Sequence, residues 1–184
     1  MLVDADTIGP SLSQLLGILD ESPGLVAACR ADDRDTLDEE IMQSLLPELR
    51  PGLRVLSGIG GVAARWPELR RTALDGVWRA LRRLGVLVVV DVAALLEEDE
   101  DLSYDTGAPQ RNAAAISALM QADAVLAVAS ADPVSITRLL RETARLKELG
   151  VERPHVAINR IGPPPSPPRP ASVSWSRTAW RRRA

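Results

Sequence analysis

Apolar and polar positions follow two different spacings along residues 1–162. Short, nearly continuous apolar runs predict β-strands, whereas apolar residues three and four positions apart predict helices. The expected strands are near 1–4, 53–57, 86–91, 124–130 and 155–159. The expected helices cover 11–17, 36–46, a stretch opened by Pro67 and ended by Gly85, 109–121 with Pro109 in its first turn, and a stretch from Asp132 to Gly150. This alternation predicts an α/β fold with a doubly wound, mostly parallel sheet and helices on both faces.

One strand and one helix carry the strongest patterns. The run "VLVVVD" at 86–91 is typical of a strand buried on both faces of a parallel sheet. The helix after Pro67 places apolar residues on a single face, so that face should pack against the sheet. Its members are Leu74, Val77, Trp78, Leu81 and Leu84.

The composition changes after Gly162, which divides the chain into a folded domain over 1–162 and a tail over 163–184. The tail holds six of the 14 prolines, five arginines and no acidic residue, and it has neither a helical nor a strand period. We therefore expect it to be disordered and to be cut by trypsin near Arg169 and Arg177. Two interpretations stay open: a frameshifted or truncated end, or a Trp- and Arg-containing segment that touches a membrane surface or an acidic partner.

Charge and rare residue types exclude several functions. The net charge is −3, and residues 1–162 alone hold 17 basic and 25 acidic residues, which is unfavourable for general nucleic-acid binding. Cys29 and His155 are single residues of their kinds, so a disulfide framework, a zinc cluster or a Ser-His-Asp triad has little to draw on. The longest apolar run, 84–96, is too short to span a bilayer and contains Asp91.

Polar residues follow the apolar strands at the positions where parallel α/β sheets bind ligands. Asp4 and Asp6 end the first strand, Asp91 ends the run at 86–91, and Asn159 ends the last strand. Ligands in such sheets lie outside the carboxyl ends of the strands, and carboxylates there suit Mg²⁺ bound through water. The structural alternative for each residue is the capping of a loop or a helix.

These segments together resemble the MinD/ParA-type ATPases, which are P-loop nucleotide hydrolases with a deviant phosphate loop. "VDADTIGPSLSQLLG" is similar to their switch segment, "VLVVVDVAALLEE" to their Walker B strand, and "ADAVLAVASADPVSITRLLRETARLKELG" with "VAINR" to their late strand–helix–strand unit. "LRVLSGIG" and "RWPELRRTALDGVWRALRRLG" resemble the CpaE/TadZ-like branch, linked to pilus assembly and to polar or septal placement. The resemblance covers about residues 1–161.

The resemblance implies roles for five residues. Asp6 would orient the attacking water, Asp4 would support the switch and the metal environment, and Asp91 would hold Mg²⁺ through its water shell. Asn159 would read the adenine edge through its amide, with Arg160 beside it at the cofactor. Mg²⁺ and ATP are the cofactors that the resemblance implies.

One element of the family pattern has no counterpart. No stretch fits G-x-x-x-x-G-K-[ST]; "SGIGGVAARW" at 57–66 lacks the lysine, and Lys147 lies within an amphipathic helix where we expect it to be solvated. We therefore expect a fold that is incomplete at its N-terminus, without the first strand, the phosphate loop and a helix. By the resemblance the missing strand would lie in mid-sheet beside 86–91. This chain alone should then not bind Mg-ATP tightly or hydrolyse it.

Two functions remain open. In the complete domain, the resemblance implies an ATP-driven positioning switch for septum-site, pilus or chromosome placement. It would be a homodimer when nucleotide is bound and would respond to an activator or a polar or pilus protein, with Arg111 in "APQRNAAAI" facing such a partner. Location would be cytoplasmic, with peripheral contact at the inner face of the plasma membrane open. The alternative is a non-catalytic relative that acts as a protein-interaction module.

Two further interpretations are disfavoured by missing residues. A flavodoxin-like or response-regulator-like domain would want a lysine at a later strand end, and Lys147 is the only lysine. A calcium site in "EEDED" at 97–101 lacks the glycine and the spaced ligands of an EF-hand, so a solvated acidic loop is the preferred interpretation.

Overall fold

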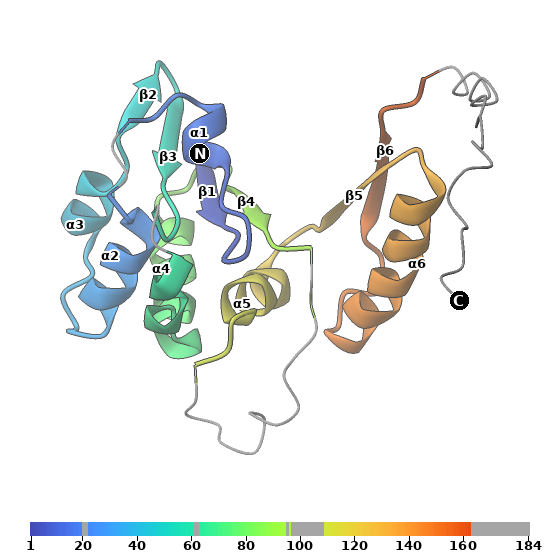
Figure 1. Cartoon of the computed structure of the whole chain (residues 1–184). Coiled ribbons are helices and arrows are strands. Elements are labelled where there is room, and N and C mark those ends of the chain that lie inside the picture. Colours follow the sequence, from blue (N-terminus) through green and yellow to red (C-terminus); the bar gives the residue numbers. More distant parts are fainter. Residues whose placement is uncertain (20–21, 61–62, 95, 97–108, 163–184) are drawn as a thin grey trace, which may run out of the picture.

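The computed structural model describes residues 1–19, 22–60, 63–94, 96 and 109–162 of the 184-residue chain (Figure 1). The expectations for the acidic segment 97–101 and for the tail 163–184 lie outside the described residues. Within the described part, strands and helices alternate, and the predicted α/β class is confirmed.

The prediction of a single sheet is wrong for the described part of the chain, where the strands form two separate sheets, because β4 and β5 are not paired with each other. The larger has the order β2-β3-β1-β4, with β1 parallel to β3 and β4 and with β2 antiparallel to β3. The smaller is the parallel pair β5-β6. The strands are β1 (Leu2–Ala5), β2 (Glu48–Arg50), β3 (Leu53–Leu56), β4 (Val89–Val92), β5 (Leu126–Ser130) and β6 (His155–Asn159).

The helices α2, α4 and α5 form a row in which α4 packs against both neighbours, and α6 packs on β5. In Figure 1, β5, β6 and α6 lie together to one side of the larger sheet. The helical elements are α1 (Leu12–Leu15), α2 (Gly24–Asp32), α3 (Glu39–Ser44), the 3₁₀ helix η1 (Ala63–Glu68), α4 (Arg71–Arg83), α5 (Ala113–Gln121) and α6 (Pro133–Glu148).

Several element bounds differ from the sequence prediction. Pro67 lies inside η1, and α4 begins only at Arg71. The helix predicted from Pro109 begins at Ala113. The short elements α2 and β2 were not predicted. The last helix starts at Asp132 as predicted, and the Asp132 carboxylate caps α6 by accepting a hydrogen bond of 2.9 Å from the Ser135 N–H.

The core lies where α2 and α4 cover β1 and β3. Leu25, Leu74 and Val77 are fully buried there together with Val3 and Leu56. The predicted apolar face of α4 is confirmed, because its apolar residues are buried apart from the partly buried Leu84. Trp78 on this face donates from Nε1 to the Ser117 Oγ at 2.9 Å, which joins α4 to α5.

The prediction that 86–91 forms a strand buried on both faces is wrong. The strand starts at Val89, which is 52% exposed, and Leu87 just before it is 80% exposed. The physical reason is that only one face of β4 is covered: Val90 and Val92 pack against the core, whereas Val89 and Asp91 on the other face are exposed. The strand is also the last of its sheet. An apolar run typical of a central strand therefore occupies an edge position.

The rare residues are placed as follows. Cys29 is buried in α2, His155 begins β6, and Lys147 is exposed on α6. The buried thiol packs as a small apolar side chain in the core. None of the helices in the described part of the chain is long and apolar enough to cross a membrane.

Candidate functional site

The carboxyl ends of β1 and β4 bring aspartates together. The two strands are parallel and adjacent, and their register places Asp4 directly opposite Asp91. Asp6 follows β1 by one residue. Burial is the main cause that raises the pKa of Asp4 and of Asp91, and the negative charge of Asp6 adds to both shifts. The structure therefore gathers three of the residues singled out in the sequence, which we call the aspartate cluster (Asp4, Asp6 and Asp91).

Asp4 is the buried member of the cluster, with 2% of its surface exposed. Its Oδ1 accepts a hydrogen bond from the Asp6 N–H and its Oδ2 accepts one from the Leu12 N–H, both at 3.2 Å. The carboxylate thus ties the end of β1 to the start of α1. Gly58 packs so closely behind it that a Cβ there would lie 2.8 Å from the Asp4 carbonyl oxygen.

Asp6 shapes the loop after β1. Its Oδ1 accepts hydrogen bonds from the N–H groups of Ile8 and Gly9, each at 2.8 Å, as is typical of an aspartate that starts a turn. Thr7 is 2% exposed, and its hydroxyl donates to the Arg111 carbonyl at 2.7 Å. The loop is therefore held against the segment that leads into α5.

The electrostatics of the cluster disfavour its fully ionised state. Burial is the main cause that raises the pKa of Asp4; the N–H groups of Leu12 and Asp6 oppose this effect, and the charges of Asp91 and Asp6 add to it. Desolvation raises the pKa of Asp91 as well, although this residue stays accessible to solvent, and the charge of Asp6 contributes further. A bound cation or a proton would relieve this repulsion.

The cluster fits a hard cation only in part. No group of three or more His, Cys, Asp or Glu side chains in the described residues has the arrangement of a metal site. Asp91 is exposed, whereas Asp4 and one oxygen of Asp6 are occupied by backbone N–H groups. Mg²⁺ keeps several of its waters and is commonly held by one or two carboxylates, so Asp91 and Asp6 suffice for a water-mediated contact.

The phosphates of a nucleotide have no comparable partners in the described chain. Lys147 projects from the exposed side of α6, and the glycine-rich stretch that begins at Ser57 contains no lysine. Gly24 and Leu25 at the start of α2 donate their N–H groups to Ser57, to its hydroxyl at 2.9 Å and its carbonyl at 2.7 Å. The residues described here therefore suit the metal side of a nucleotide site and not its phosphate side.

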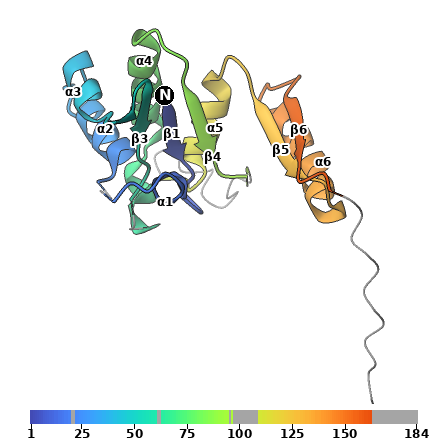
Figure 2. The ribbon, with the colours of Figure 1, turned by 90° about the horizontal axis from the view of Figure 1, so that it is seen from above.

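Asn159 and Arg160 lie on the smaller sheet. Asn159 ends β6 opposite Ser130, and its Oδ1 accepts a hydrogen bond of 2.8 Å from the Arg160 N–H. Arg160 has a φ of 55°, so the chain turns sharply at this point. Neither residue forms a hydrogen bond or ion pair with the aspartate cluster, although Figure 2 shows β4 and β6 running toward the same side of the molecule.

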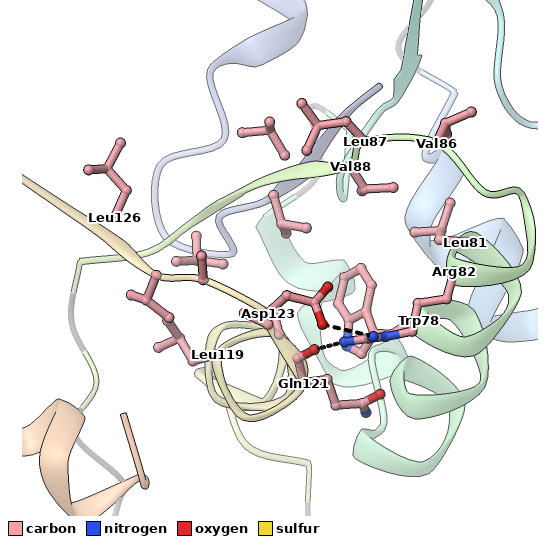
Figure 3. A pocket seen from close by; sticks show the side chains of 17 residues that line it. Trp78, Leu81, Arg82, Val86, Leu87, Val88, Leu119, Gln121, Asp123 and Leu126 are labelled. Atoms are coloured by element: carbon pink, nitrogen blue, oxygen red, sulfur yellow. Dashed lines mark hydrogen bonds and ion pairs between the residues drawn. The ribbon is translucent and has the colours of Figure 1, made fainter. Parts of the chain in front are cut away.

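A groove between β4 and β5 was not predicted. It has a volume of about 570 Å³, and we call it the β4–β5 groove. Trp78, Leu81 and Leu119 from α4 and α5 line it together with Val90 and Leu126 from the two strands (Figure 3). The sequence signal was the apolar run at 84–96 itself, which was interpreted as buried within a sheet.

Comparison with known proteins adds no assignment. A scan of the chain against models of protein families finds no matching family, and a search of curated proteins finds no significant match.

Proposed function

We propose that this chain carries the switch and metal-binding half of a nucleotide hydrolase with a doubly wound, P-loop-like sheet. The observation that carries the proposal is the Asp4–Asp91 register at the carboxyl ends of two adjacent parallel strands, with Asp6 in electrostatic contact. In this proposal Asp91 holds Mg²⁺ through water, Asp6 orients the attacking water, and Asp4 keeps the loop in place. Asn159 and Arg160 contact the base.

The resemblance to MinD/ParA-type ATPases supplies the biological side of the proposal. The complete domain would bind ATP, dimerise and release its partner upon hydrolysis, as a switch for septum-site, pilus or chromosome placement. Bound Mg²⁺ would neutralise phosphate charge. This chain's own residues would orient the water at Asp6 and hold that aspartate through the Ile8 and Gly9 N–H groups.

Metal binding can be tested with Mn²⁺, which replaces Mg²⁺ and broadens nearby NMR signals. We expect weak binding, at roughly millimolar concentration, that selectively broadens amides in the loop after β1 and at the end of β4. Asp91→Asn should remove most of this broadening. The acidic pair Asp32 and Asp33 at the end of α2 is the internal control, because it has charge without the paired strand ends. Equal broadening there would show general attraction of cations and contradict the proposal.

Nucleotide binding can be tested by supplying the phosphate loop. The 184-residue chain alone should give no calorimetric signal with Mg-ATP. Its described residues do not include the phosphate loop and lysine that would donate several charge-assisted hydrogen bonds to the phosphates. Fusion of a strand–loop–helix segment with a G-x-x-x-x-G-K-[ST] loop should create ATP binding and slow hydrolysis. Asp6→Ala in the fused protein should lower kcat more than it weakens ATP binding. A fused protein that folds but neither binds nor hydrolyses ATP would exclude the ATPase.

A second candidate function is a protein-interaction module without turnover. The β4–β5 groove favours it, because apolar side chains on both flanks are open to solvent: Val89 is 52% and Leu126 62% exposed. The groove and the aspartate cluster use different side chains, although the strand that the resemblance places beside 86–91 would lie against the edge of β4 that borders the groove.

A further inference from the structure

Thr7 is the buried residue among 6–11, the residues that lead from β1 to α1. The next residue, Ile8, is 46% exposed. The Thr7 hydroxyl donates a hydrogen bond of 2.7 Å to the Arg111 carbonyl, 104 positions further along the chain. By contrast, the hydrogen bonds that Asp6 Oδ1 accepts come from Ile8 and Gly9, two and three positions away. Thr7 therefore connects this loop to a distant element of the fold.

The acceptor of this hydrogen bond belongs to a well-packed part of the chain. Arg111 lies two residues before α5, and the first residues of that helix, Ala113 and Ala114, are buried. α5 is in turn joined to α4, because Trp78 Nε1 donates to the Ser117 Oγ. The Arg111 carbonyl therefore gives the loop a fixed point of attachment on the helices.

Asp6 has no comparable attachment of its own. In the described part of the chain, its carboxylate accepts hydrogen bonds from the N–H groups of its own loop alone. Its N–H donates to Asp4 Oδ1 at 3.2 Å, at the long end of the usual range. On its other side is Thr7, whose Cα is about 3.8 Å away along the chain. The position of the Asp6 carboxylate therefore depends on how the loop is held at Thr7.

Electrostatic repulsion makes this attachment necessary. Besides burial, which is the main cause, the charge of Asp6 raises the pKa of both Asp4 and Asp91. Like charges at this distance favour a loop that carries Asp6 away from the strand ends. A buried hydroxyl opposes this movement, because leaving the Arg111 carbonyl would cost Thr7 a hydrogen bond that water does not readily replace.

We propose that Thr7 is the positioning residue for Asp6: its hydroxyl holds the loop on the Arg111 carbonyl and keeps the Asp6 carboxylate beside Asp91. The two carboxylates can then contact the water shell of one divalent cation, which a single exposed aspartate would hold more weakly. This role rests on the function proposed above for the aspartate cluster. Thr7 itself touches neither the cation nor the reacting water.

The first measurement needs no metal and uses amide hydrogen exchange of the full chain. Thr7→Val removes the hydroxyl and keeps a branched side chain of similar size. The N–H groups of Ile8 and Gly9, which bind Asp6, should then exchange about two- to tenfold faster, as expected for the loss of one hydrogen bond. Thr7→Ser keeps the hydroxyl and should restore the slower exchange.

A second threonine provides the matched control. Thr36 also donates to a carbonyl, that of Ala31 at 3.0 Å, but it lies exposed in the turn after α2. Thr36→Val should leave exchange at Ile8 and Gly9 unchanged. If Thr7→Val does not fold, Thr7→Cys takes its place, because a thiol is only a weak donor.

The second measurement separates positioning from stability of the loop. Mn²⁺ added to the wild-type chain should broaden the amides of Ile8 and Gly9 together with that of Val92 at the end of β4. In Thr7→Val the ion stays at Asp91 while Asp6 moves away, so the ratio of loop broadening to Val92 broadening should fall. This ratio does not depend on how much of the chain is occupied. A threonine that only stabilised the loop would lower the free energy of unfolding and leave the ratio unchanged.

Two outcomes would overturn the proposal: unchanged exchange or an unchanged broadening ratio in a folded Thr7→Val protein, or equal changes in Thr36→Val. Restoration of both values by Thr7→Ser would support it. If Mn²⁺ does not bind at the cluster of the wild-type chain, the proposed metal function fails. The exchange comparison then decides by itself whether Thr7 holds Asp6 in place.

Discussion

Asp4 and Asp91 lie opposite each other in the register of β1 and β4, one buried and the other exposed. Two carboxylates in this position repel each other, and Asp6 adds a third negative charge. The cluster is thus a local cost to folding that a cation would offset, and this cost can be measured.

The first prediction concerns pH. The pKa values of Asp4 and Asp91 are raised above the ordinary 3.8, so the folded state binds more protons than the unfolded state just above that pH. Stability should therefore fall as pH rises through the interval between the ordinary and the raised pKa, and should then level off. Asp91→Asn should stabilise the protein at neutral pH and flatten this slope, as measured by urea unfolding from about pH 4 to pH 7.

The control for this experiment is Glu152→Gln, which neutralises an exposed acid on the loop before β6. It should leave both the stability and its pH slope unchanged. If Asp91→Asn and Glu152→Gln behave alike, the charge of Asp91 has no special electrostatic position.

A second prediction concerns the contact between α4 and α5. The buried Ser117 hydroxyl accepts from Trp78 Nε1 at 2.9 Å and donates to Asp75 Oδ1 at 2.7 Å. Ser117→Ala leaves the indole N–H without this acceptor and should destabilise the protein by about 1–3 kcal/mol. Ser44→Ala, which removes an exposed hydroxyl bonded only to its own helix, should have a much smaller effect in the same denaturant titration.

A third prediction uses the single cysteine. Burial, followed by the charges of Asp33 and Asp32, raises the pKa of the Cys29 thiol, so little thiolate forms near neutral pH. Iodoacetamide should therefore label the native chain far more slowly than the chain in denaturant. Fast labelling of native protein, followed by mass spectrometry, would show that α2 opens locally.

Sequence periodicity predicted the class of fold well because strands and helices were each marked by local patterns. The apolar face of α4 from Leu74 to Leu81 follows directly from the spacing of its residues, and the start of α6 at Asp132 follows from the Asp-Pro pair. The pairing of the strands was harder to predict from the sequence. The apolar run around Val89 is the same in sequence whether a strand covers its outer edge or not, so its exposure could not be inferred from the residues themselves.

The candidate site likewise has features that the sequence could predict and features that it could not. Strand-end positions predicted that Asp4, Asp91 and Asn159 would lie together at one edge of a sheet. Asp4 and Asp91 do so, whereas Asn159 ends a strand of the smaller sheet. The bonds of Asp6 to the Ile8 and Gly9 N–H groups are local turn contacts that the spacing could have indicated. Nothing local indicated that Thr7 would bind the Arg111 carbonyl. That contact depends on the path of the loop in three dimensions.

The last prediction tests whether the close packing behind the aspartate cluster matters for what the cluster does. A Cβ on Gly58 would lie 2.8 Å from the Asp4 carbonyl oxygen and 3.2 Å from its Cγ, closer than such atoms approach without displacement. Gly58→Ala should therefore push the end of β1 away from β3, and overpacking of this kind costs about 1–3 kcal/mol. Because the shift moves Asp4 relative to Asp91, the Mn²⁺-induced broadening of the loop amides should also decrease. Gly162→Ala is the control, since a Cβ there meets no atom within 4 Å. A Gly58→Ala protein with unchanged stability and unchanged broadening would show that β1 and β3 can separate at this point without disturbing the cluster.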